Sequence, residues 1–451
     1  MKKTQIRGFL HGPTWLYMLM AVHLAVAPAA QTTGAALFDE VWTTINAAYY
    51  DPAFGGLNWA AVRDELRPKA AESASIDDTH TIINEMLGRL KRSHFALIPA
   101  GGSSSESALR GPANVAIDVR VLGGGSLVVT HVIENSPAAR AGLAAGQRLV
   151  SIDDEPIAAR AGEAPLNFWR RANAILHGYP NAPAALTVLT PDGRTLKLAV
   201  PRTIEAGETV LFSNLPPMHV RVEQHPENTP AGKRVGVIGV NVWMAQVNEP
   251  IAKAVDTFRS ADGLVIDLRG NPGGLAGMIM GLAGQILDTP ALIGTMRTRQ
   301  VPRLEFVANP RRSTIDGRSV TPYAGPVAIL IDEMSASASE CFAGGLQDLG
   351  RVRVFGRTSM GAALPASTKR LSNGDVLEYV VGDFVTSKGR SLEGRGVVPD
   401  EIQPLTVESL ARGEDAPLKA ALAWIDRTHR TGETGKTAGA EKTAKLDNVR
   451  R

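Results

Sequence analysis

The sequence predicts a multi-domain α/β protein with an N-terminal helical unit, a β-rich domain and an α/β domain. Apolar residues recur at helix spacing between Phe38 and Leu90. Between Gly111 and Arg202 the pattern changes to short alternating or β-branched runs, which favour strands. After residue 233, buried-strand patterns alternate with helical patterns, which is typical of a largely parallel sheet.

Composition sets limits on both structure and partners. The chain has 451 residues, of which 44% are hydrophobic and 21% charged, as in an ordinary globular protein of two or three domains. A formal net charge of +3 offers no bulk attraction to nucleic acid, so we expect no nucleic-acid partner. The single cysteine, Cys341, excludes an internal disulfide and a multi-thiolate metal site.

Residues 1–29 have the pattern of a secretory signal peptide. A basic start precedes an apolar stretch from Trp15 to Ala27, and small residues near Ala29 offer a cleavage site. An uncleaved anchor is the alternative, but the stretch is short for a bilayer of about 30 Å. We therefore expect an exported protein, periplasmic or secreted, with no stable membrane span after cleavage.

Residues 30–100 form the predicted helical unit, which ends near Ser93-His94. The Gly- and Ser-rich stretch from Gly101 to Ser107 predicts a linker. The β-rich domain spans residues 108–203 and includes one helix around Asn167 to Leu176. Its segment from Val132 to Ile152 resembles the core of a PDZ domain in its bacterial, protease-associated form.

The remaining chain divides into three predicted parts. Residues 204–232 are polar and contain proline, which predicts a linker. Residues 233–412 form the α/β domain, and residues 413–451 a C-terminal helix and a disordered tail. The tail is expected to be disordered because it lacks an apolar face from about Thr428 onward.

Ser337 is the candidate nucleophile. It follows the buried strand Val327 to Ile331, where the next helix should begin, so a helix N-terminus would favour the negative charge that its attack generates. Small neighbours leave room for a substrate carbonyl. The alternative is a helix cap, since Ser335 or Ser337 would also bond the free amides of a first helical turn.

A glycine-rich loop from Asp267 to Gly274 lies between a strand and a helix, where backbone amides can form an anion nest. Acyl transfer needs such donors where the oxyanion develops, each worth roughly 2.7–4 kcal/mol of barrier. We predict an oxyanion hole from the amide of Gly273 or Gly274 and that of Ala338. The alternative for the loop is a tight turn.

From Phe38 to Ile402 the chain resembles the serine peptidase family of the carboxyl-terminal processing (tail-specific) proteases and the core of tricorn protease. The resemblance rests on four ordered segments: Asn271-Pro272-Gly273-Gly274, Ser335-Ala336-Ser337-Ala338-Ser339-Glu340, Gly356 to Gly361, and Gly396-Val397-Val398-Pro399-Asp400. It implies an α/β domain of the crotonase-like, tail-specific protease type. It also implies Ser337 as nucleophile, with no metal or organic cofactor.

The resemblance also concerns the base. In the tail-specific branch a lysine lies 25 positions after the nucleophile, where this chain has Ala362. The tricorn-like branch instead uses a Ser-His pair, which Ser93-His94 matches, and a glutamate three residues before a glycine, which Glu393 matches. A neutral imidazole with pKa about 6.5 accepts a proton at neutral pH, whereas an ordinary lysine with pKa about 10.4 does not.

Other assignments stay open at this point. His94 would serve equally as a structural histidine at a domain seam, and Glu393 as a solvated loop residue. Other potential bases lack a matching context: His80, His131, His177, His219, His225, Lys369 and Lys388.

The predicted function is therefore an exported serine endopeptidase or carboxyl-terminal processing peptidase. Its substrates would be peptides or proteins, captured through the C-terminus by the PDZ-like domain, with Gly111 to Ile117 as the candidate carboxylate loop. The domain would otherwise be purely structural, and a homo-oligomer stays open. The alternative function, motivated by Ala362, is an inactive peptide-binding or scaffolding protein of the same fold, with hydrophobic-ligand binding as a third choice.

Overall fold

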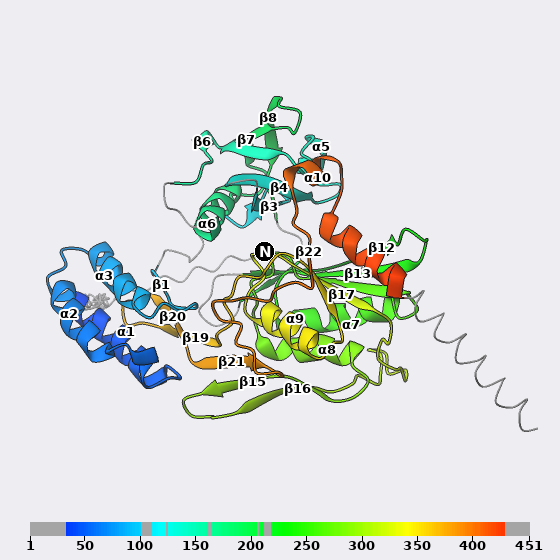
Figure 1. Ribbon diagram of the computed structural model, residues 1–451. Helices are drawn as coiled ribbons and strands as arrows, with labels where there is room; N and C mark the ends of the chain where they lie inside the picture. The colour runs from blue at the N-terminus through cyan, green and yellow to red at the C-terminus, as the bar shows by residue number, and fades with distance from the viewer. Residues whose placement is uncertain are drawn as a thin grey trace, which may run out of the picture.

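The computed structural model describes residues 33–100, 111–122, 125–160, 165–204, 207–211 and 218–428. It confirms the predicted fold class, with a helical unit, a β-rich domain and an α/β domain (Figure 1). The predicted signal peptide and the predicted disordered tail beyond residue 428 lie outside the described residues. No helix within the described ranges is long and apolar enough to cross a membrane.

The helical unit packs on a later part of the chain. It contains α1 (Gly34–Ala48), α2 (Trp59–Ala71) and α3 (Ile76–Gly88), with the short η1 (Phe54–Gly56). Each α-helix begins at a polar cap whose side chain accepts a backbone N–H, supplied by Thr33, Asn58 and Ser75. Its buried core includes Leu364, Leu371, Leu377 and Val380 from the C-terminal half of the chain. The helical unit therefore folds back onto segments about 300 residues away in sequence.

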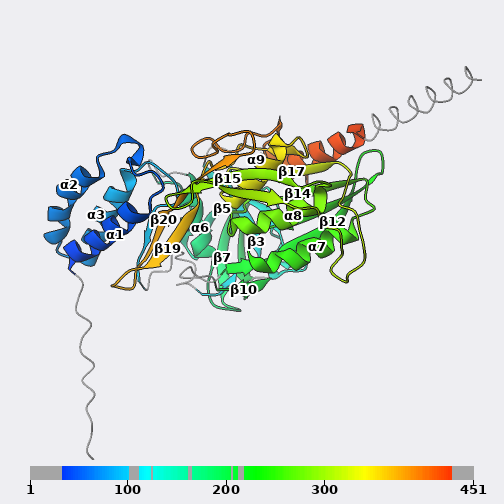
Figure 2. The ribbon, with the colours of Figure 1, turned by 90° about the horizontal axis from the view of Figure 1, so that it is seen from below.

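A small sheet in the order β1-β20-β19 joins the two parts. Strand β1 (Ala96–Ile98) follows the helices, whereas β19 (Ala366–Arg370) and β20 (Val376–Val380) come from the later segment. All neighbours in this sheet are antiparallel. The sheet lies between the helices and the α/β domain in two perpendicular views (Figures 1 and 2).

The β-rich domain is a curved antiparallel sheet in the order β3-β4-β5-β7-β8, with β6 paired to β5. Helix α6 packs against the edge strand β3. The bounds are β2 (Ala113–Asn114), β3 (Ile117–Leu122), β4 (Ser126–Val132), α5 (Pro137–Arg140), β5 (Arg148–Ile152), β6 (Glu155–Pro156), α6 (Pro165–Leu176), β7 (Pro183–Leu189), β8 (Thr195–Pro201) and β9 (Thr203–Ile204).

The α/β domain is built on a sheet in the order β12-β13-β14-β17-β18-β22, parallel except for β12. On β17, Val327, Ile329 and Ile331 face one apolar cluster while Ala328 and Leu330 face another. Its strands are β12 (Val222–Asn228), β13 (Arg234–Val240), β14 (Gly263–Asp267), β17 (Val327–Ile331), β18 (Arg353–Gly356) and β22 (Glu401–Ile402). Burial on both faces explains why the central strands are continuous apolar runs.

Helices cover both faces of this sheet. One face carries α7 (Asn248–Thr257), α8 (Ile279–Ile286) and α9 (Ala338–Asp348), and Figure 2 shows α7 and α8 lying across the strands. The helix over residues 416–428 packs on the other face. A further sheet, in the order β16-β15-β21, packs against α9; it comprises β15 (Ala291–Thr298), β16 (Leu304–Ala308) and β21 (Gly382–Thr386).

The stretch 204–232, which the sequence predicts as a linker, contains strands. They are β10 (Glu208–Val210), β11 (Met218–Val220) and β12. Strand β12 pairs with β13 over its whole length, but it is an edge strand and most of its side chains are exposed. The polar composition of β12 and its Pro226 give no apolar run, so the sequence does not predict a strand here. An edge strand is held by backbone pairing on one side and does not require buried side chains.

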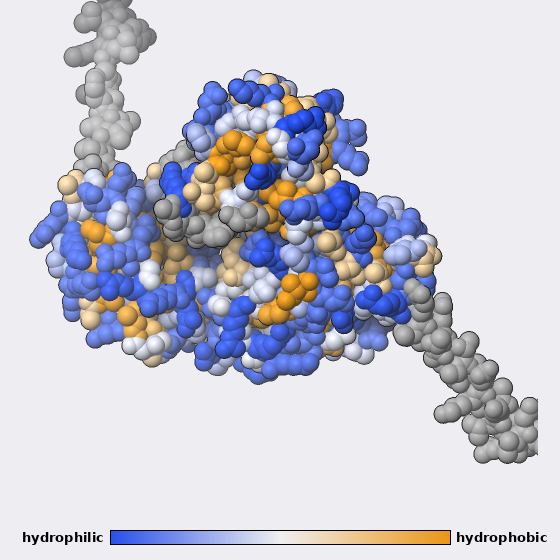
Figure 3. Space-filling view, turned by 45° about the horizontal axis from the view of Figure 1, so that its top comes forward, coloured by the Kyte–Doolittle hydropathy of each residue, from blue (hydrophilic) through white to orange (hydrophobic). Residues whose placement is uncertain are grey.

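The β-rich domain also contacts the segment that follows the sheet. Leu122 and Val128 pack with Leu405, Val407 and Leu410, the last two in α10 (Val407–Ala411). Figure 3 shows a largely hydrophilic surface with separate apolar patches, which gather on the β-rich domain and near its border with the α/β domain. The C-terminal segment thus holds the β-rich domain beside the α/β domain.

Candidate active site

Ser337 occupies a strained turn between β17 and α9. It is half-buried and precedes the first residue of α9, with φ 53° and ψ −116°. A positive φ is costly for a residue with a Cβ atom, and such strain clusters at functional sites. The Ser337 N–H lies 2.8 Å from the carbonyl oxygen of Ala362 and 3.0 Å from Glu340 Oε2. These bonds hold the backbone of the turn.

Glu340 is a buried carboxylate that ties the turn to a neighbouring loop. It accepts hydrogen bonds from Ser359 Oγ at 2.6 Å, Gly361 N at 2.8 Å, Ala362 N at 2.9 Å and Ser337 N at 3.0 Å. Burial raises its pKa, although these donors oppose the shift. Glu340 is part of the Ser335 to Glu340 motif, but the motif alone assigns it no role. The signal was its spacing three residues after Ser337, as in a capping box.

The predicted oxyanion loop lies directly against the nucleophile. A Cβ atom on Gly273 would stand 2.6 Å from Ser337 Cβ and 3.0 Å from Ala338 N, so only glycine fits there. However, the Gly273 N–H already donates to Asn271 Oδ1 at 2.9 Å. Its neighbour Gly274 forms a parallel bridge with Trp243. In this bridge the backbone of Trp243 is hydrogen-bonded to Gly273 and Leu275, so the N–H of Gly274 points away from Trp243. Gly274 is therefore the better-placed donor of the two.

Ala338 has the position expected of the second oxyanion donor. As the first residue of α9, its N–H has no acceptor within the helix. The helix dipole adds a partial positive charge at this point.

The candidate base lies in a bonded group of its own. Ser93 donates its backbone N–H to Glu393 Oε1 and its hydroxyl to Glu393 Oε2, both at 2.9 Å. Ser93 Oγ is also 2.8 Å from His94 Nδ1. A hydroxyl has one hydrogen, so the Ser93 oxygen accepts from Nδ1–H, and Nε2 of His94 keeps its lone pair. This is the tautomer that a general base requires.

His94, like Ser337, has a positive φ, of 58°. Burial lowers the pKa of His94 below its ordinary value of 6.5, while the charges of Glu378 and Glu393 oppose that shift. The imidazole is thus kept neutral at neutral pH, as proton acceptance requires.

Ala362 and Ala363 connect the Ser337 turn with the group formed by Ser93, His94 and Glu393. Ser337 N donates to the Ala362 carbonyl at 2.8 Å, and Ala363 N donates to Glu393 Oε2 at 3.1 Å. A continuous path of hydrogen bonds and backbone therefore runs from Ser337 through this dipeptide to Glu393, Ser93 and His94. Hydrogen bonds join Ser93, His94 and Glu393, and the backbone of Ala362 and Ala363 links this group to the Ser337 turn. Among the described residues, no hydrogen bond joins Ser337 Oγ directly to His94. Ala362 contributes only a methyl group where the tail-specific branch has a lysine.

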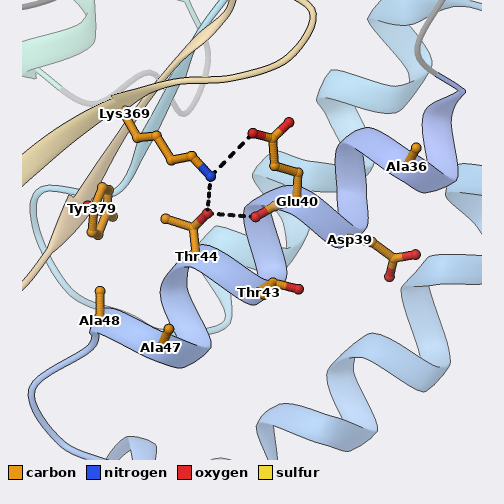
Figure 4. A pocket seen from close by; sticks show the side chains of 9 residues that line it. All are labelled: Ala36, Asp39, Glu40, Thr43, Thr44, Ala47, Ala48, Lys369 and Tyr379. Atoms are coloured by element: carbon orange, nitrogen blue, oxygen red, sulfur yellow. Dashed lines mark hydrogen bonds and ion pairs between the residues drawn. The ribbon is translucent and has the colours of Figure 1, made fainter.

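Lys369, one alternative base, is engaged elsewhere. Its ammonium lies 3.2 Å from Glu40 Oε1 and 3.1 Å from Thr44 Oγ1 of α1. Figure 4 shows it pointing toward α1 across an open groove of about 660 Å³. Lys388 is exposed on the turn after β21.

The other candidate histidines also have contacts outside the site. The pairs are His80 with Asp375 at 2.8 Å, His131 with Asp118 at 3.3 Å, His177 with the Asn173 carbonyl at 3.0 Å, His219 with Thr209 at 3.4 Å, and His225 with Glu227 at 3.6 Å. Among the residues that the structure describes, no three His, Cys, Asp or Glu side chains converge on a common metal position.

The β-rich domain touches the turn that precedes Ser337. Arg120 of β3 donates to Asp332 Oδ2 at 2.8 Å, and Asp332 Oδ1 accepts the N–H of Gly270 at 2.8 Å and of Met334 at 3.0 Å. Burial alone would raise the pKa of Asp332, but Arg120 and these donors lower it. The charged pair thus connects β3 with both loops that flank the nucleophile.

The edge of β3 is occupied in this structure. The Val119 carbonyl accepts from Trp169 Nε1 at 2.8 Å and from Arg120 Nη1 at 2.9 Å. In the predicted carboxylate loop, Ala113 N donates to Gly178 and Ala116 N to Asn114 Oδ1. Strand addition at this edge would require Trp169 and Arg120 to release Val119.

Comparison with known proteins gives matches along most of the chain. Residues 234–402 match peptidase family S41, residues 32–88 the tricorn protease C1 domain, and residues 128–164 a PDZ domain. The carboxyl-terminal-processing protease of Picosynechococcus sp. is 25% identical over 399 residues, covering 85% of this chain and 87% of that protein. The carboxyl-terminal-processing protease of Synechocystis sp. is 25% identical over 441 residues, covering 96% of this chain and 94% of that protein.

Solved structures show the same fold. The photosystem II D1 C-terminal processing protease has a TM-score of 0.54 at 24% identity, covering 86% of this chain and 99% of that one. Mature CPAF has a TM-score of 0.56 at 14% identity, covering 88% of this chain and 96% of that one.

Proposed function

We propose that Ser337 is the nucleophile and His94 the general base of this chain, which is a serine-type hydrolase similar to peptidase family S41 over residues 234–402. The path of bonds from Ser337 through Ala362 and Ala363 to Glu393, Ser93 and His94 carries this proposal. It favours the Ser-His-Glu arrangement over a Ser-Lys one, since Ala362 stands where the lysine would be.

The proposed reaction proceeds through an acyl-enzyme. Ser337 Oγ attacks the substrate carbonyl as Nε2 of His94 takes its proton. His94 then gives the proton to the leaving amine, and water repeats the sequence to release the acyl group. Ser93 and Glu393 are positioning residues: they hold Nδ1–H, and the carboxylate stabilises the imidazolium that forms.

The oxyanion would be bound by the amides of Gly274 and Ala338. Ala338 follows Ser337 directly, and Gly274 follows Gly273, the loop residue that lies against Ser337. Neither N–H is donated to an acceptor within the described residues. Gly273 lets the loop backbone lie close to Ser337 but does not supply an oxyanion donor, because its N–H donates to Asn271 Oδ1.

The PDZ domain and the peptidase domain imply peptide or protein substrates. Cleavage near a substrate's C-terminus is proposed from the names of the relatives, which are carboxyl-terminal-processing proteases. Export is proposed from the pattern of residues 1–29. N-terminal sequencing of the protein from a periplasmic or culture fraction should begin near residue 30, and an intact Met1 in the cytoplasmic fraction would contradict it.

The catalytic assignment is tested with Ser337→Ala and His94→Ala. Each should lower kcat for an unstructured peptide substrate by at least about 10³-fold, because triad members act as a unit. A fluorophosphonate probe should label the wild type and not Ser337→Ala. Circular dichroism and the urea midpoint serve as fold controls. Undiminished turnover in either folded variant would refute the assignment.

A further inference from the structure

Acidic side chains surround the candidate site, and nearly all have a partner within it. Glu340 accepts four hydrogen bonds, Glu393 accepts from Ser93 and Ala363, and Asp332 pairs with Arg120. Each of these charges is balanced by groups of the protein itself. Glu378 differs from them.

Glu378 lies in the middle of β20, the central strand of the β1-β20-β19 sheet. It pairs with Ala96 of β1 on one side and Thr368 of β19 on the other. The neighbouring pair Leu97 and Leu377 points into the core of the helical unit. Since side chains alternate along a strand, Glu378 points to the opposite face.

His94 lies two residues before Ala96, the cross-strand partner of Glu378. Apart from burial, Glu378 is the group with the largest influence on the pKa of His94, larger than that of Glu393. Register and electrostatics therefore both place this carboxylate beside the imidazole.

Glu378 is half-buried, and within the described ranges its carboxylate makes no hydrogen bond or ion pair. Arg370, a cation on the same face of β19, donates to the Gly374 carbonyl instead. A partly desolvated carboxylate without a cation is costly, and a ligand cation would relieve that cost.

We propose that Glu378 is a specificity-determining residue that binds a lysine or arginine side chain of the substrate, at one of the first two positions after the scissile bond. The inference rests on the proposed function. The side of the bond follows from the chemistry: the base that takes the serine proton gives it to the leaving amine, so the imidazole stands on the leaving-group side. A carboxylate beside the imidazole would therefore contact substrate residues that follow the scissile bond.

The test uses the full mature chain. An unfolded protein such as β-casein is digested, and the products are sequenced by mass spectrometry. The wild type should preferentially cleave bonds that have Lys or Arg at the first or second position after the bond. Quenched fluorogenic peptides that carry Lys, Gln or Glu at the preferred one of these two positions, and are otherwise identical, then give kcat/KM. We expect Lys to exceed Glu by about tenfold, equivalent to about 1.4 kcal/mol, and the ratio to fall with salt.

Substitutions assign this preference to the side chain. Glu378→Gln should bring the Lys/Glu ratio of kcat/KM close to one, and Glu378→Lys should invert it. Glu305→Gln, which removes an exposed carboxylate from β16, is the matched control and should keep the wild-type ratio.

The outcomes separate the two proposals. An indifferent wild type, or a ratio that survives Glu378→Gln, overturns the assignment of Glu378 while hydrolysis itself still supports Ser337 and His94. If the wild type cleaves no peptide and takes no fluorophosphonate label, the proposed function fails and the specificity claim falls with it.

Discussion

The two halves of the candidate site are built differently. The nucleophile half, with Ser337, Glu340 and the Gly273 loop, lies within one domain and is joined by buried hydrogen bonds. The base half brings Ser93 and His94 from the end of the helical unit to Glu393 of the α/β domain, 300 residues from Ser93. One half is fixed by the core of a domain, whereas the other is assembled at the seam between two bodies.

This difference predicts which substitutions affect stability as well as activity. A buried carboxylate with several donors is part of the domain's interior, and its loss leaves N–H groups unpaired. A half-buried group at a seam has access to water when a contact is lost. Changes in the nucleophile half should therefore lower both kcat and the free energy of unfolding, and changes in the base half mainly kcat.

Among substitutions that keep both Ser337 and His94, Glu340→Gln should have the largest effect. The amide presents one acceptor oxygen and an NH₂ group to four donors, so at least one buried donor loses its partner. We expect kcat to fall on the order of 100-fold, because the loop carrying Ala362 shifts against Ser337. The free energy of unfolding should fall by about 1–3 kcal/mol. Steady-state kinetics and urea unfolding measure the two quantities.

Glu333→Gln is the matched control for that variant. Glu333 lies on the same turn, but it is partly exposed and its contact with Arg357 is 3.7 Å long. It should change kcat by less than about twofold and stability by less than about 0.5 kcal/mol. Wild-type kcat and stability in Glu340→Gln would show that the nucleophile half does not depend on this carboxylate.

The same contrast explains what the sequence can predict. The nucleophile half depends on neighbours: Ser337 and Glu340 are three residues apart, and the strand before them is a continuous apolar run. The base half depends on contacts between distant segments, which no local pattern encodes. Resemblance to the tricorn-like branch therefore had to supply Ser93, His94 and Glu393.

Other features were missed for physical reasons. The choice between Gly273 and Gly274 depends on a side-chain bond from Asn271, which composition does not reveal. Glu378 belongs to a short strand whose pairing with β1 arises only when the helical unit folds back. The sequence of the edge strand β12 predicts a linker because most of its side chains face water.

Glu393→Gln should have a smaller effect, confined to catalysis. Removing the negative charge leaves the imidazolium less stabilised when His94 holds the serine proton, so we expect kcat to fall on the order of 10-fold with little change in the urea midpoint. A loss of stability as large as that of Glu340→Gln would contradict the distinction between the two halves.

The pH dependence of this variant gives the sharpest measure of the base half. The active form has a neutral His94, so kcat/KM should fall as the pH decreases through the pKa of that group, and the wild-type midpoint should lie below pH 6.5 because burial lowers the pKa. The charge of Glu393 opposes the lowering, so Glu393→Gln should move the midpoint to still lower pH. Glu340→Gln should reduce the height of the profile at every pH without moving the midpoint, since the charges acting on His94 are those of Glu378 and Glu393. A midpoint that moves in Glu340→Gln and stays fixed in Glu393→Gln would reverse the assignment of the two halves.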